Sequence, residues 1–249
     1  MFFYMKDNLK FLHDCVLIKD TLVIGDLHIG YDERFGRSIG QVQLENIIEK
    51  LEGIFENIKE LGVRLKRVVL LGDVKHFFSG ITDIEWRETL SLLDYIKVKS
   101  RGAKIIIIKG NHDNILEPIV KKRNIDLKEY FIMEIDSKKY CFLHGDKMFE
   151  QCLDADWLLF GHWHPSITLS DDYKHERFKC FLKGKWKKKN VIIFPSFSDI
   201  KYGSNLNNLK NENDKFSFIK YKDIMKFEVI IYNDDEKREY NFGKLSKLI

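Results

Sequence analysis

The stretch Ile105-Ile106-Ile107-Ile108-Lys109-Gly110-Asn111-His112-Asp113 contains the pattern that decides the fold. Four consecutive isoleucines are β-branched and apolar, and such a short run is typical of a strand buried on both faces, as in a parallel sheet. A glycine then permits a sharp turn, and three polar residues follow that could each meet a metal or a phosphate. Because ligands of open α/β sheets lie beyond the carboxyl ends of the strands, we expect other strands to deliver polar residues to the same edge.

The same order, an apolar strand-like run followed by polar residues, occurs at four other places in the chain. The apolar runs cover residues 21–25, 67–71, 140–143 and 157–160. The polar residues that follow them are Asp26 and His28, Asp73, His144, and His162 and His164. A single histidine of this kind would be interpreted as an ordinary core or surface residue. Five repeats at strand ends predict instead that these side chains converge on one site.

Helical patterns separate the predicted strands at residues 21–25, 67–71 and 105–108. Residues 41–61 and 83–98 place apolar side chains at helical spacing. Strand, helix, strand, helix and strand in succession predict a parallel sheet with right-handed crossovers. We expect Asp113 or Asn114 to cap a further short helix that ends near Arg123.

The second half of the chain changes to a pattern dominated by strands. Further strands are expected at residues 130–135, 140–143, 177–182, 191–194, 216–221 and 226–232. Residues 205–214 are rich in Asn and Lys and predict a mobile loop.

The length and composition indicate one folded domain. The chain has 249 residues, of which 44% are apolar and 32% charged, and its net charge of +4 permits an anionic partner without demanding one. Only three prolines occur, so no proline-rich linker divides the chain, and we expect a single domain over residues 1–249. No apolar signal core and no run of about 18 apolar residues is present, which predicts a cytoplasmic protein with no membrane span.

The cysteines show no spacing typical of a metal or redox motif. None of the four forms a Cys-x-x-Cys pair, and three lie in apolar, strand-like contexts. We expect buried, reduced thiols at Cys15, Cys141, Cys152 and Cys180.

The residue types at the strand ends favour a particular metal chemistry. Oxygen and imidazole ligands without thiolate suit divalent Mn, Fe, Ni or Zn. The candidate ligands exceed the needs of one ion and fit two ions that share a bridging carboxylate, for which Asp73, alone at its strand end, is the natural choice. Two such ions acidify a bridging water and stabilise the attacking and leaving oxygens of a phosphoryl group. Only two carboxylates, Asp26 and Asp73, face four metal charges, so the site favours phosphate.

In this order the five motifs resemble those of the calcineurin-like metallophosphoesterases. They are Asp26-Leu27-His28, Gly72-Asp73, Gly110-Asn111-His112-Asp113, His144 and Gly161-His162-Trp163-His164. The resemblance implies a four-layer α/β sandwich, in which two mixed β-sheets are flanked by helices. It also implies that Asp26, His28 and His164 hold one metal, that Asn111, His144 and His162 hold the other, and that Asp73 bridges them. His112 would then stabilise charge on the phosphoryl oxygens or protonate the leaving oxygen.

One residue departs from a large branch of that family. In the phosphomonoesterase and protein-phosphatase branch the third residue after the bridging Asp is usually another Asp, which orients the catalytic His. Here it is His76, which looks like the DNA-repair nuclease branch; the pattern Val74-Lys75-His76 is similar to a small archaeal group related to that branch. A histidine adds no negative charge beside the substrate. We therefore expect His76 to support catalysis and to favour diesters, although a surface position is the alternative.

Two other segments have both a functional and an ordinary interpretation. The basic stretch 177–189 surrounds Trp186 and could bind a nucleic-acid backbone and stack a base. The same pattern also suits a solvated hairpin tip whose lysines discourage edge pairing. Asp32, Arg34 and Arg37 follow the first motif and either line the site or form a solvated loop. Asp113 closes the third motif, and we interpret it as a helix cap or a brace for the loop rather than as a residue that meets a metal or a phosphate.

These features together predict a phosphodiesterase with two divalent metals, Mn²⁺ being the first choice and Fe, Ni or Zn the alternatives. A metal-bridging hydroxide would attack phosphorus in line, and the substrate would be a phosphodiester of nucleic-acid or nucleotide type. A phosphomonoesterase is the alternative activity. A non-catalytic scaffold that retains the fold is the third interpretation, although all of the expected ligands are present.

Overall fold

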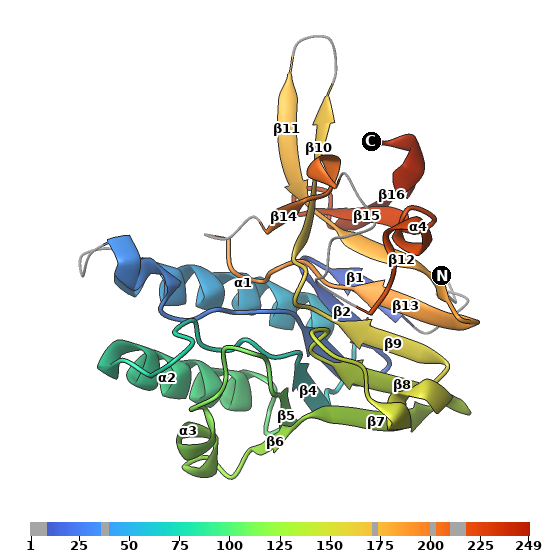
Figure 1. The fold of residues 1–249 in the computed structure, drawn as a ribbon. Coiled ribbons are helices and arrows are strands. Elements are labelled where there is room, and N and C mark those ends of the chain that lie inside the picture. Colours follow the sequence, from blue (N-terminus) through green and yellow to red (C-terminus); the bar gives the residue numbers. More distant parts are fainter. Residues whose placement is uncertain (1–8, 36–39, 171–173, 200–202, 210–217) are drawn as a thin grey trace.

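Two mixed β-sheets packed face to face form the middle layers of the fold (Figure 1). The structure is a computed structural model that describes residues 9–35, 40–170, 174–199, 203–209 and 218–249. The first sheet has six strands in the order of the sequence: β1 (Leu9–Leu12), β2 (Cys15–Ile18), β3 (Thr21–Ile24), β4 (Arg67–Leu70), β5 (Lys104–Ile108) and β6 (Asp126–Lys128). Its first three strands are antiparallel, and β3 to β6 are parallel, as their helical crossovers require.

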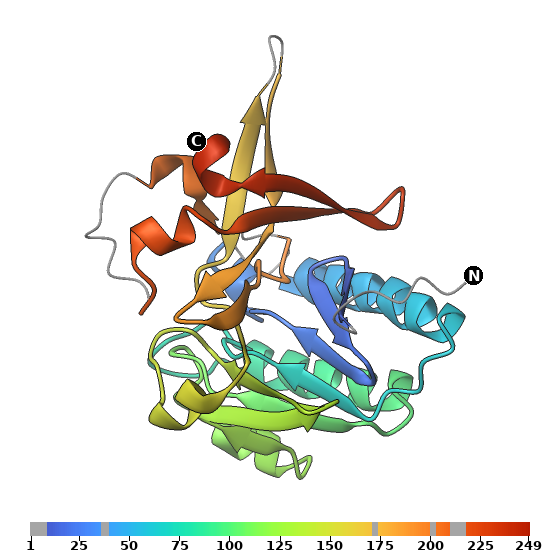
Figure 2. The same ribbon diagram turned by 90° about the vertical axis from the view of Figure 1, so that its right-hand side faces the viewer.

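The second sheet has seven strands and is also mixed. Its order is β16 (Arg238–Lys244), β15 (Glu228–Asn233), β12 (Phe181–Trp186), β13 (Lys189–Ile193), β9 (Trp157–Phe160), β8 (Lys138–Leu143) and β7 (Tyr130–Ile135). Strands β13, β9 and β8 are parallel to one another, and the remaining neighbours are antiparallel. A third sheet joins β11 (His175–Lys179), β10 (Pro165–Ser170) and β14 (Ser204–Asn205). In Figure 2 its β10–β11 hairpin extends beyond the rest of the molecule.

The isoleucine run explains how the layers meet. Ile105 and Ile107 pack in the core beneath α1 (Gly40–Glu60) and α2 (Asp83–Lys99), whereas Ile106 and Ile108 pack between the two sheets. Neighbouring side chains of a strand point to opposite faces, so a strand covered on both sides needs four apolar residues in a row. The expectation of a strand buried on both faces is confirmed.

The outer layers differ in their helices. The helices α1, α2 and α3 (Glu117–Lys121) cover the first sheet (Figure 1). The outer face of the second sheet packs against short segments, which include η2 (Glu150–Asp154), η3 (Leu206–Asn208), α4 (Tyr221–Ile224) and η4 (Leu245–Lys247). One further short helix, η1 (Tyr31–Phe35), follows the first motif. The predicted class, a sandwich of two mixed sheets between outer layers, is confirmed, with few helices on one side.

Several local predictions are wrong. The strand expected at 177–182 is interrupted at Cys180, because β11 and β12 belong to different sheets. Residues 218–220 lie in no strand, and α4 begins at Tyr221, where a closing strand was expected. The helix α3 follows Leu116 and has no side-chain cap, so neither Asp113 nor Asn114 caps it.

The predicted mobile loop at 205–214 is also wrong where the structure describes it. Asn205 belongs to β14, and Leu206 is buried at the start of η3. Residues 210–214 lie outside the described residues. None of the helices in the described part of the chain is long and apolar enough to span a bilayer.

The expectation of four reduced cysteines is wrong for two of them. A disulfide joins Cys141 on β8 to Cys152 on η2, whose Cα atoms lie 5.6 Å apart. This pairing depends on how η2 folds back over the second sheet, which the sequence pattern does not reveal. Cys15 and Cys180 are free and buried.

Candidate metal centre

The predicted ligands follow the carboxyl ends of five strands that meet at one place. Strands β3, β4 and β5 of the first sheet lead to Asp26 and His28, Asp73, and Asn111 and His112. Strands β8 and β9 of the second sheet lead to His144, His162 and His164. The backbone also connects the motifs, because the amide of His28 donates to the carbonyl oxygen of Asp73 at 2.8 Å. The convergence predicted from the repeated strand-end pattern is therefore present.

Asp26, His28 and His164 form the first group of candidate ligands. One ligand atom from each lies within 4.8 Å of the others, and all three residues are buried. Nε2 of His164 is 3.2 Å from Oδ1 of Asp26 and 3.4 Å from Nε2 of His28. An acid oxygen and two imidazole nitrogens therefore face a common point, which suits a divalent ion.

Asp73, His144 and His162 form a second group with the same property. Nε2 of His144 is 3.0 Å from Nδ1 of His162, 3.0 Å from Oδ1 of Asn111 and 3.5 Å from Oδ1 of Asp73. Its other ring nitrogen, Nδ1, lies 2.9 Å from the carbonyl oxygen of Leu71 and donates to it. That hydrogen bond leaves the lone pair of Nε2 directed at the group, as in histidines that bind metals.

The carboxylate of Asp73 lies between the two groups. Its Oδ1 faces His144 of the second group, and its Oδ2 is 3.6 Å from Nε2 of His28 in the first. Within the described part of the chain, the ion-pair partners of Asp26 and Asp73 are all histidines. Among the described residues, these two buried carboxylates thus have no lysine or arginine partner, and a buried charge of this kind is stable when it is paired or binds a metal.

The charges within the site affect one another. Burial alone would raise the pKa of the Asp26 carboxyl, but His164, His144 and His162 together lower it to about 2. Burial works against charge on His144, yet Asp26 and Asp73 outweigh it and raise the pKa of that ring. Burial and then the nearby His144 lower the pKa of His162. The donor set is therefore an ionised carboxylate among imidazoles, which fits divalent cations with oxygen and nitrogen ligands.

The backbone at the site is strained. His28, Asp73, His162 and His164 have φ between 46° and 66°, the left-handed region that residues other than glycine seldom adopt. Each costs free energy and persists only where the surrounding structure holds it. Four of the seven candidate ligands are strained in this way, which indicates that the surrounding structure holds these side chains in their positions at a cost in free energy.

Two motif glycines leave room for the carboxylates. A Cβ on Gly110 would collide with Oδ1 and the backbone nitrogen of Asp73, and a Cβ on Gly161 would collide with Oδ2 of Asp26. The glycines that begin the third and fifth motifs are therefore required, because a carboxylate from another strand approaches each of them closely.

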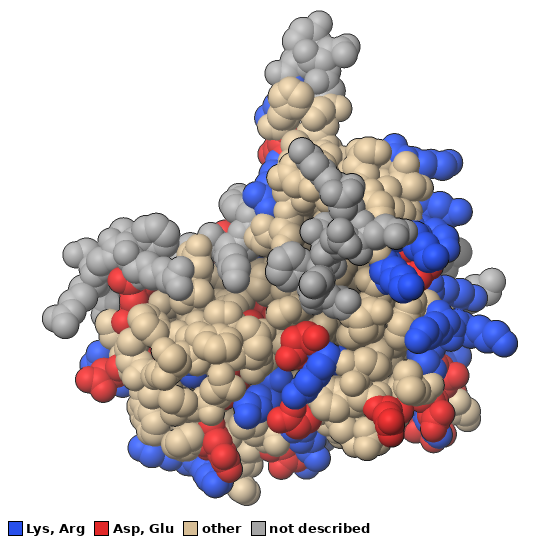
Figure 3. Space-filling model, in the orientation of Figure 1, with Lys and Arg blue, Asp and Glu red and all other residues tan. Residues whose placement is uncertain are grey.

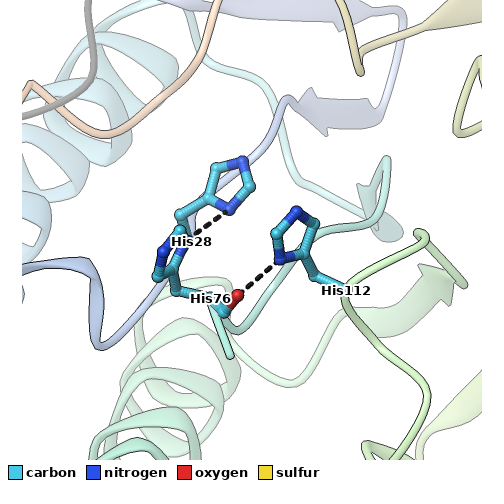
Figure 4. Close-up of side chains that lie close together, drawn as sticks. All are labelled: His28, His76 and His112. Carbon is cyan, nitrogen blue, oxygen red and sulfur yellow. Dashed lines mark hydrogen bonds between the residues drawn. The ribbon is translucent and has the colours of Figure 1, made fainter. Parts of the chain in front are cut away.

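His112 and His76 lie beside the first group (Figure 4). Nδ1 of His112 donates to the carbonyl oxygen of His76, and Nε2 of His112 is 3.9 Å from Oδ2 of Asp73. The two rings are nearly parallel, with centroids 5.4 Å apart. Nδ1 of His76 is also 3.4 Å from Nδ1 of His28. His76 is buried, at 4% exposure, so the surface interpretation of this residue is wrong.

Asp113 braces the loops of the second and third motifs. Its fully buried carboxylate accepts from the backbone N–H groups of Val74 and Lys75 at 3.0 and 3.3 Å, and from Gly110 at 2.9 Å. Burial, followed by repulsion from Asp73, raises the pKa of Asp113 to about 7. Of the two interpretations of Asp113, the brace is confirmed.

A buried glutamine was missed in the sequence. Oε1 of Gln43 accepts from the amides of Gly30 and Tyr31, each at 3.1 Å, and its Nε2 donates to the carbonyl oxygen of His28 at 2.9 Å. Gln43 thus secures the loop after the first motif from the start of α1. A polar residue among the apolar positions of a helix was the available signal, but it did not reveal the partner.

The loop after the first motif is less exposed than a solvated loop. Asp32 is fully buried, and its Oδ2 accepts from the amide of Gln43 at 3.3 Å. Arg37 and the side chain of Arg34 lie outside the described residues.

The basic stretch 177–189 does not form one continuous surface. Trp186 is only 6% exposed and packs against Phe218 with ring centroids 5.4 Å apart, so it is a core residue and not a platform for a base. Lys179 pairs with Asp14 and Asp199, and Lys189 donates to the carbonyl oxygen of Ala155. Figure 3 shows Lys and Arg gathered along the right-hand edge, where β12 and β13 lie in Figure 1.

The exposed lysines of this stretch lie away from the candidate metal centre. Strands β13 and β9 are parallel, and Asn190 pairs with Trp157 at the amino end of β9. The turn at Lys187 and Lys188 therefore lies at the amino end of the parallel strands, whereas His162 follows the carboxyl end of β9. This geometry favours the solvated hairpin tip over a nucleic-acid surface that leads into the site.

The comparisons with known proteins agree with the motifs. The family model for calcineurin-like phosphoesterases matches residues 20–194, which include all five motifs. The chain therefore belongs to the calcineurin-like phosphoesterase family, whose members are hydrolases of phosphoester bonds that use divalent metals. A comparison with curated protein sequences finds no match.

Several solved structures are similar to this chain at low identity, and one of them has a TM-score above 0.5. The nuclease MPE from Pseudomonas putida is 16% identical with a TM-score of 0.58, over 94% of each chain. Yfce, a phosphoesterase from E. coli, is 13% identical with a TM-score of 0.43, over 90% of this chain and 98% of that one. An archaeal phosphodiesterase is 14% identical with a TM-score of 0.38, over 90% and 98%. At these identities the likeness concerns the fold alone.

Proposed function

We propose that this protein is a phosphodiesterase whose centre holds two divalent metal ions and that its substrates are diesters of nucleic-acid or nucleotide type. The observation that carries the proposal is the position of Asp73. Its two carboxylate oxygens face histidines of two separate ligand groups, 3.5 Å from His144 and 3.6 Å from His28. A carboxylate placed in this way suits a bridge between two ions.

The proposed ligands divide as the two groups do. Asp26, His28 and His164 hold one ion, Asn111, His144 and His162 hold the other, and Asp73 belongs to both. Mn²⁺ is the first choice for oxygen and imidazole donors, with Fe, Ni or Zn as alternatives. Two such ions supply acidified water and positive charge for the phosphoryl oxygens.

We assign the proton-transfer role to His112. Its Nδ1 hydrogen is held by the carbonyl oxygen of His76, so the ring is fixed and Nε2 is directed towards the centre. In the imidazolium form, Nε2 carries a proton that it can give to the departing oxygen. His112 is 21% exposed on its side chain, which leaves it accessible to a substrate.

His76 acts on catalysis through other residues in this proposal. It contacts His28 of the first ligand group, and its carbonyl oxygen orients His112. A carboxylate at position 76 would add negative charge beside the substrate, whereas a histidine does not. This absence of charge supports a diester substrate, and the family fold shared with a nuclease is compatible with it.

The decisive experiment is a substrate panel with the metal-loaded protein. Purified protein is supplied with Mn²⁺, Fe²⁺, Ni²⁺ or Zn²⁺ and assayed on bis(p-nitrophenyl) phosphate, p-nitrophenyl phosphate, single- and double-stranded DNA, RNA and cyclic nucleotides. We expect the aryl diester to be hydrolysed with a higher kcat/KM than the aryl monoester. The reverse ratio would replace the proposal with a phosphomonoesterase.

A matched pair of variants separates catalysis from folding. His112→Asn should lower kcat on the diester about a hundredfold or more, whereas His175→Asn, at an exposed histidine on β11, should leave it unchanged. Bound metal with no turnover on any ester would support a non-catalytic scaffold instead.

A further inference from the structure

Two neighbouring phenylalanines are exposed beside the candidate metal centre. Phe77 is 41% exposed and Phe78 is 55% exposed. They lie between β4 and α2, on the same segment as Asp73 and His76. Single exposed apolar residues are common on protein surfaces and need no explanation. Two adjacent exposed aromatic rings beside a group of candidate ligands are less common and do need an explanation.

The ring of Phe78 contacts the residue proposed to donate the proton. Its centroid lies 5.5 Å from that of His112, and the two rings are perpendicular. The His112 ring in turn lies 5.0 Å from the ring of His28. Only the ring of His112 therefore lies between Phe78 and the candidate ligand His28.

The segment that carries the two rings is held firmly. Oε1 of the fully buried Glu85 accepts from the amides of His76 and Phe77 at 2.9 and 2.6 Å. The buried Lys75 donates its ammonium group to the carbonyl oxygen of Phe77. Thr82 and Glu85 then close the segment with a reciprocal capping box at the start of α2. The backbone that carries the two exposed rings is therefore fixed on both sides, which lowers the cost of ordering this segment for a ligand.

We propose that Phe78, with Phe77 beside it, is a stacking platform for a flat ring attached to the scissile phosphate, and that this ring is a nucleobase. The inference rests on the proposed function and refines its substrate class to nucleoside esters. A diester bound at the metal centre has a substituent that extends past His112, and the next surface it meets is an aromatic face. Bases stack on such faces whatever their sequence.

The platform favours an unpaired base. Bases within a duplex are stacked on their neighbours and cannot lie against Phe78 unless they are extruded. Single-stranded nucleic acid, frayed ends and dinucleotides are therefore the expected substrates. A protein partner fits less well, because two side chains are far smaller than the roughly 800 Å² per partner that a stable protein interface buries.

The test uses two diesters that differ only in their bases. One is the thymidine dinucleotide dTpdT, and the other has the same sugar–phosphate skeleton with hydrogen in place of both bases. With the metal-loaded wild-type protein, we expect kcat/KM for dTpdT to be about tenfold higher. Phe78→Leu should lower kcat/KM for dTpdT far more than kcat/KM for the abasic diester and so remove that preference, whereas Phe78→Trp should preserve it. Phe242→Leu, at a similarly exposed phenylalanine on β16, is the matched control.

Each other outcome overturns the inference in a distinguishable way. Equal efficiency of the wild type on both diesters removes the platform but leaves the proposed function intact. An equal loss on both diesters in Phe78→Leu means that Phe78 positions His112 and binds no base. If the metal-loaded wild type hydrolyses neither of these two diesters and no diester of the panel, both the proposed function and the stacking platform are wrong.

Discussion

Gly161 and the carboxylate of Asp26 occupy adjoining space, although 135 positions separate them in the chain. A Cβ at position 161 would collide with Oδ2 of Asp26, and the amide of the next residue, His162, donates to that same oxygen at 3.0 Å. The glycine of the fifth motif therefore lets the second sheet approach a carboxylate of the first. The position of a metal ligand thus depends on the lack of a side chain on another strand.

Gly161→Ala should displace Asp26 and reduce metal binding. We expect the bound metal per protein to fall and kcat/KM to fall at least about tenfold, because the carboxylate and the new methyl group cannot share the space. Metal content by mass spectrometry and diester turnover are the measurements. Gly80→Ala is the control, since a Cβ at Gly80 would meet nothing within 4 Å. Unchanged metal content in Gly161→Ala would show that Asp26 is not a ligand.

Asp73→Asn should remove metal from both groups of ligands. The carboxylate faces His28 and His144 at once, so its loss removes the shared negative charge from each group. We expect the metal-to-protein ratio to fall towards zero, with turnover lost. Asp146→Asn, at an exposed residue two positions after His144, should retain the wild-type ratio. Retention of one ion per protein in Asp73→Asn would contradict the bridging role.

His112→Asn should separate metal binding from turnover. The ring contributes a proton and no metal contact in the proposed scheme, so metal content should equal that of the wild type. Loss of general acid catalysis typically lowers kcat by about a hundredfold or more. Metal analysis and steady-state kinetics on the same preparation provide the readout. A parallel loss of metal would mean that His112 is a ligand and that its assignment is wrong.

Glu88→Gln should stabilise the protein at alkaline pH. Glu88 is buried, and its Oε2 has no hydrogen-bond partner among the residues that the structure describes. Burial, and then the charges of Asp32 and Glu33, raise its pKa from 4.5 to about 7. A carboxyl whose folded pKa is raised contributes stability that is fully present below its unfolded pKa and is lost as the pH rises through 7.

Urea unfolding at pH 5 and pH 8 tests this sign. We expect Glu88→Gln to unfold at a higher urea concentration than the wild type at pH 8, and the difference to shrink at pH 5. Glu60→Gln, at an exposed position on α1, should show no such pH dependence. A stabilisation by Glu88→Gln of the same size at both pH values would contradict the link to ionisation of Glu88.

Sequence patterns were informative where the determining contacts are local or repeated. The four isoleucines at 105–108 predicted a strand covered on both faces, because only burial on both sides tolerates an unbroken apolar run. The five strand-end motifs predicted that their polar side chains would converge, and the family resemblance implied that Asp26 and His164 would share one metal; Nε2 of His164 lies 3.2 Å from Oδ1 of Asp26. The family and the approximate site could therefore be predicted before any contact was known.

The remaining features depend on which residues of distant segments come to lie together. Stacking of a base was one of two interpretations of Trp186 in its run of lysines, but the ring packs in the core against Phe218. Cys141 and Cys152 were expected to be reduced thiols, but η2 folds over β8 and brings the two residues together in a disulfide. Asp113 had the spacing of a helix cap, yet its carboxylate accepts hydrogen bonds from the two backbone amides that follow the second motif.

The sequence by itself determined the order of strands and ligands, because hydrophobic periodicity and the chemistry of the motif residues are properties of short segments. Only the tertiary structure decided that Gly161 makes room for Asp26, that Gln43 secures the loop after His28, and that Phe78 stays exposed beside His112. The reason is physical: burial, collision and hydrogen bonding are properties of pairs of atoms, and these pairs form between segments that the chain brings together only when it folds.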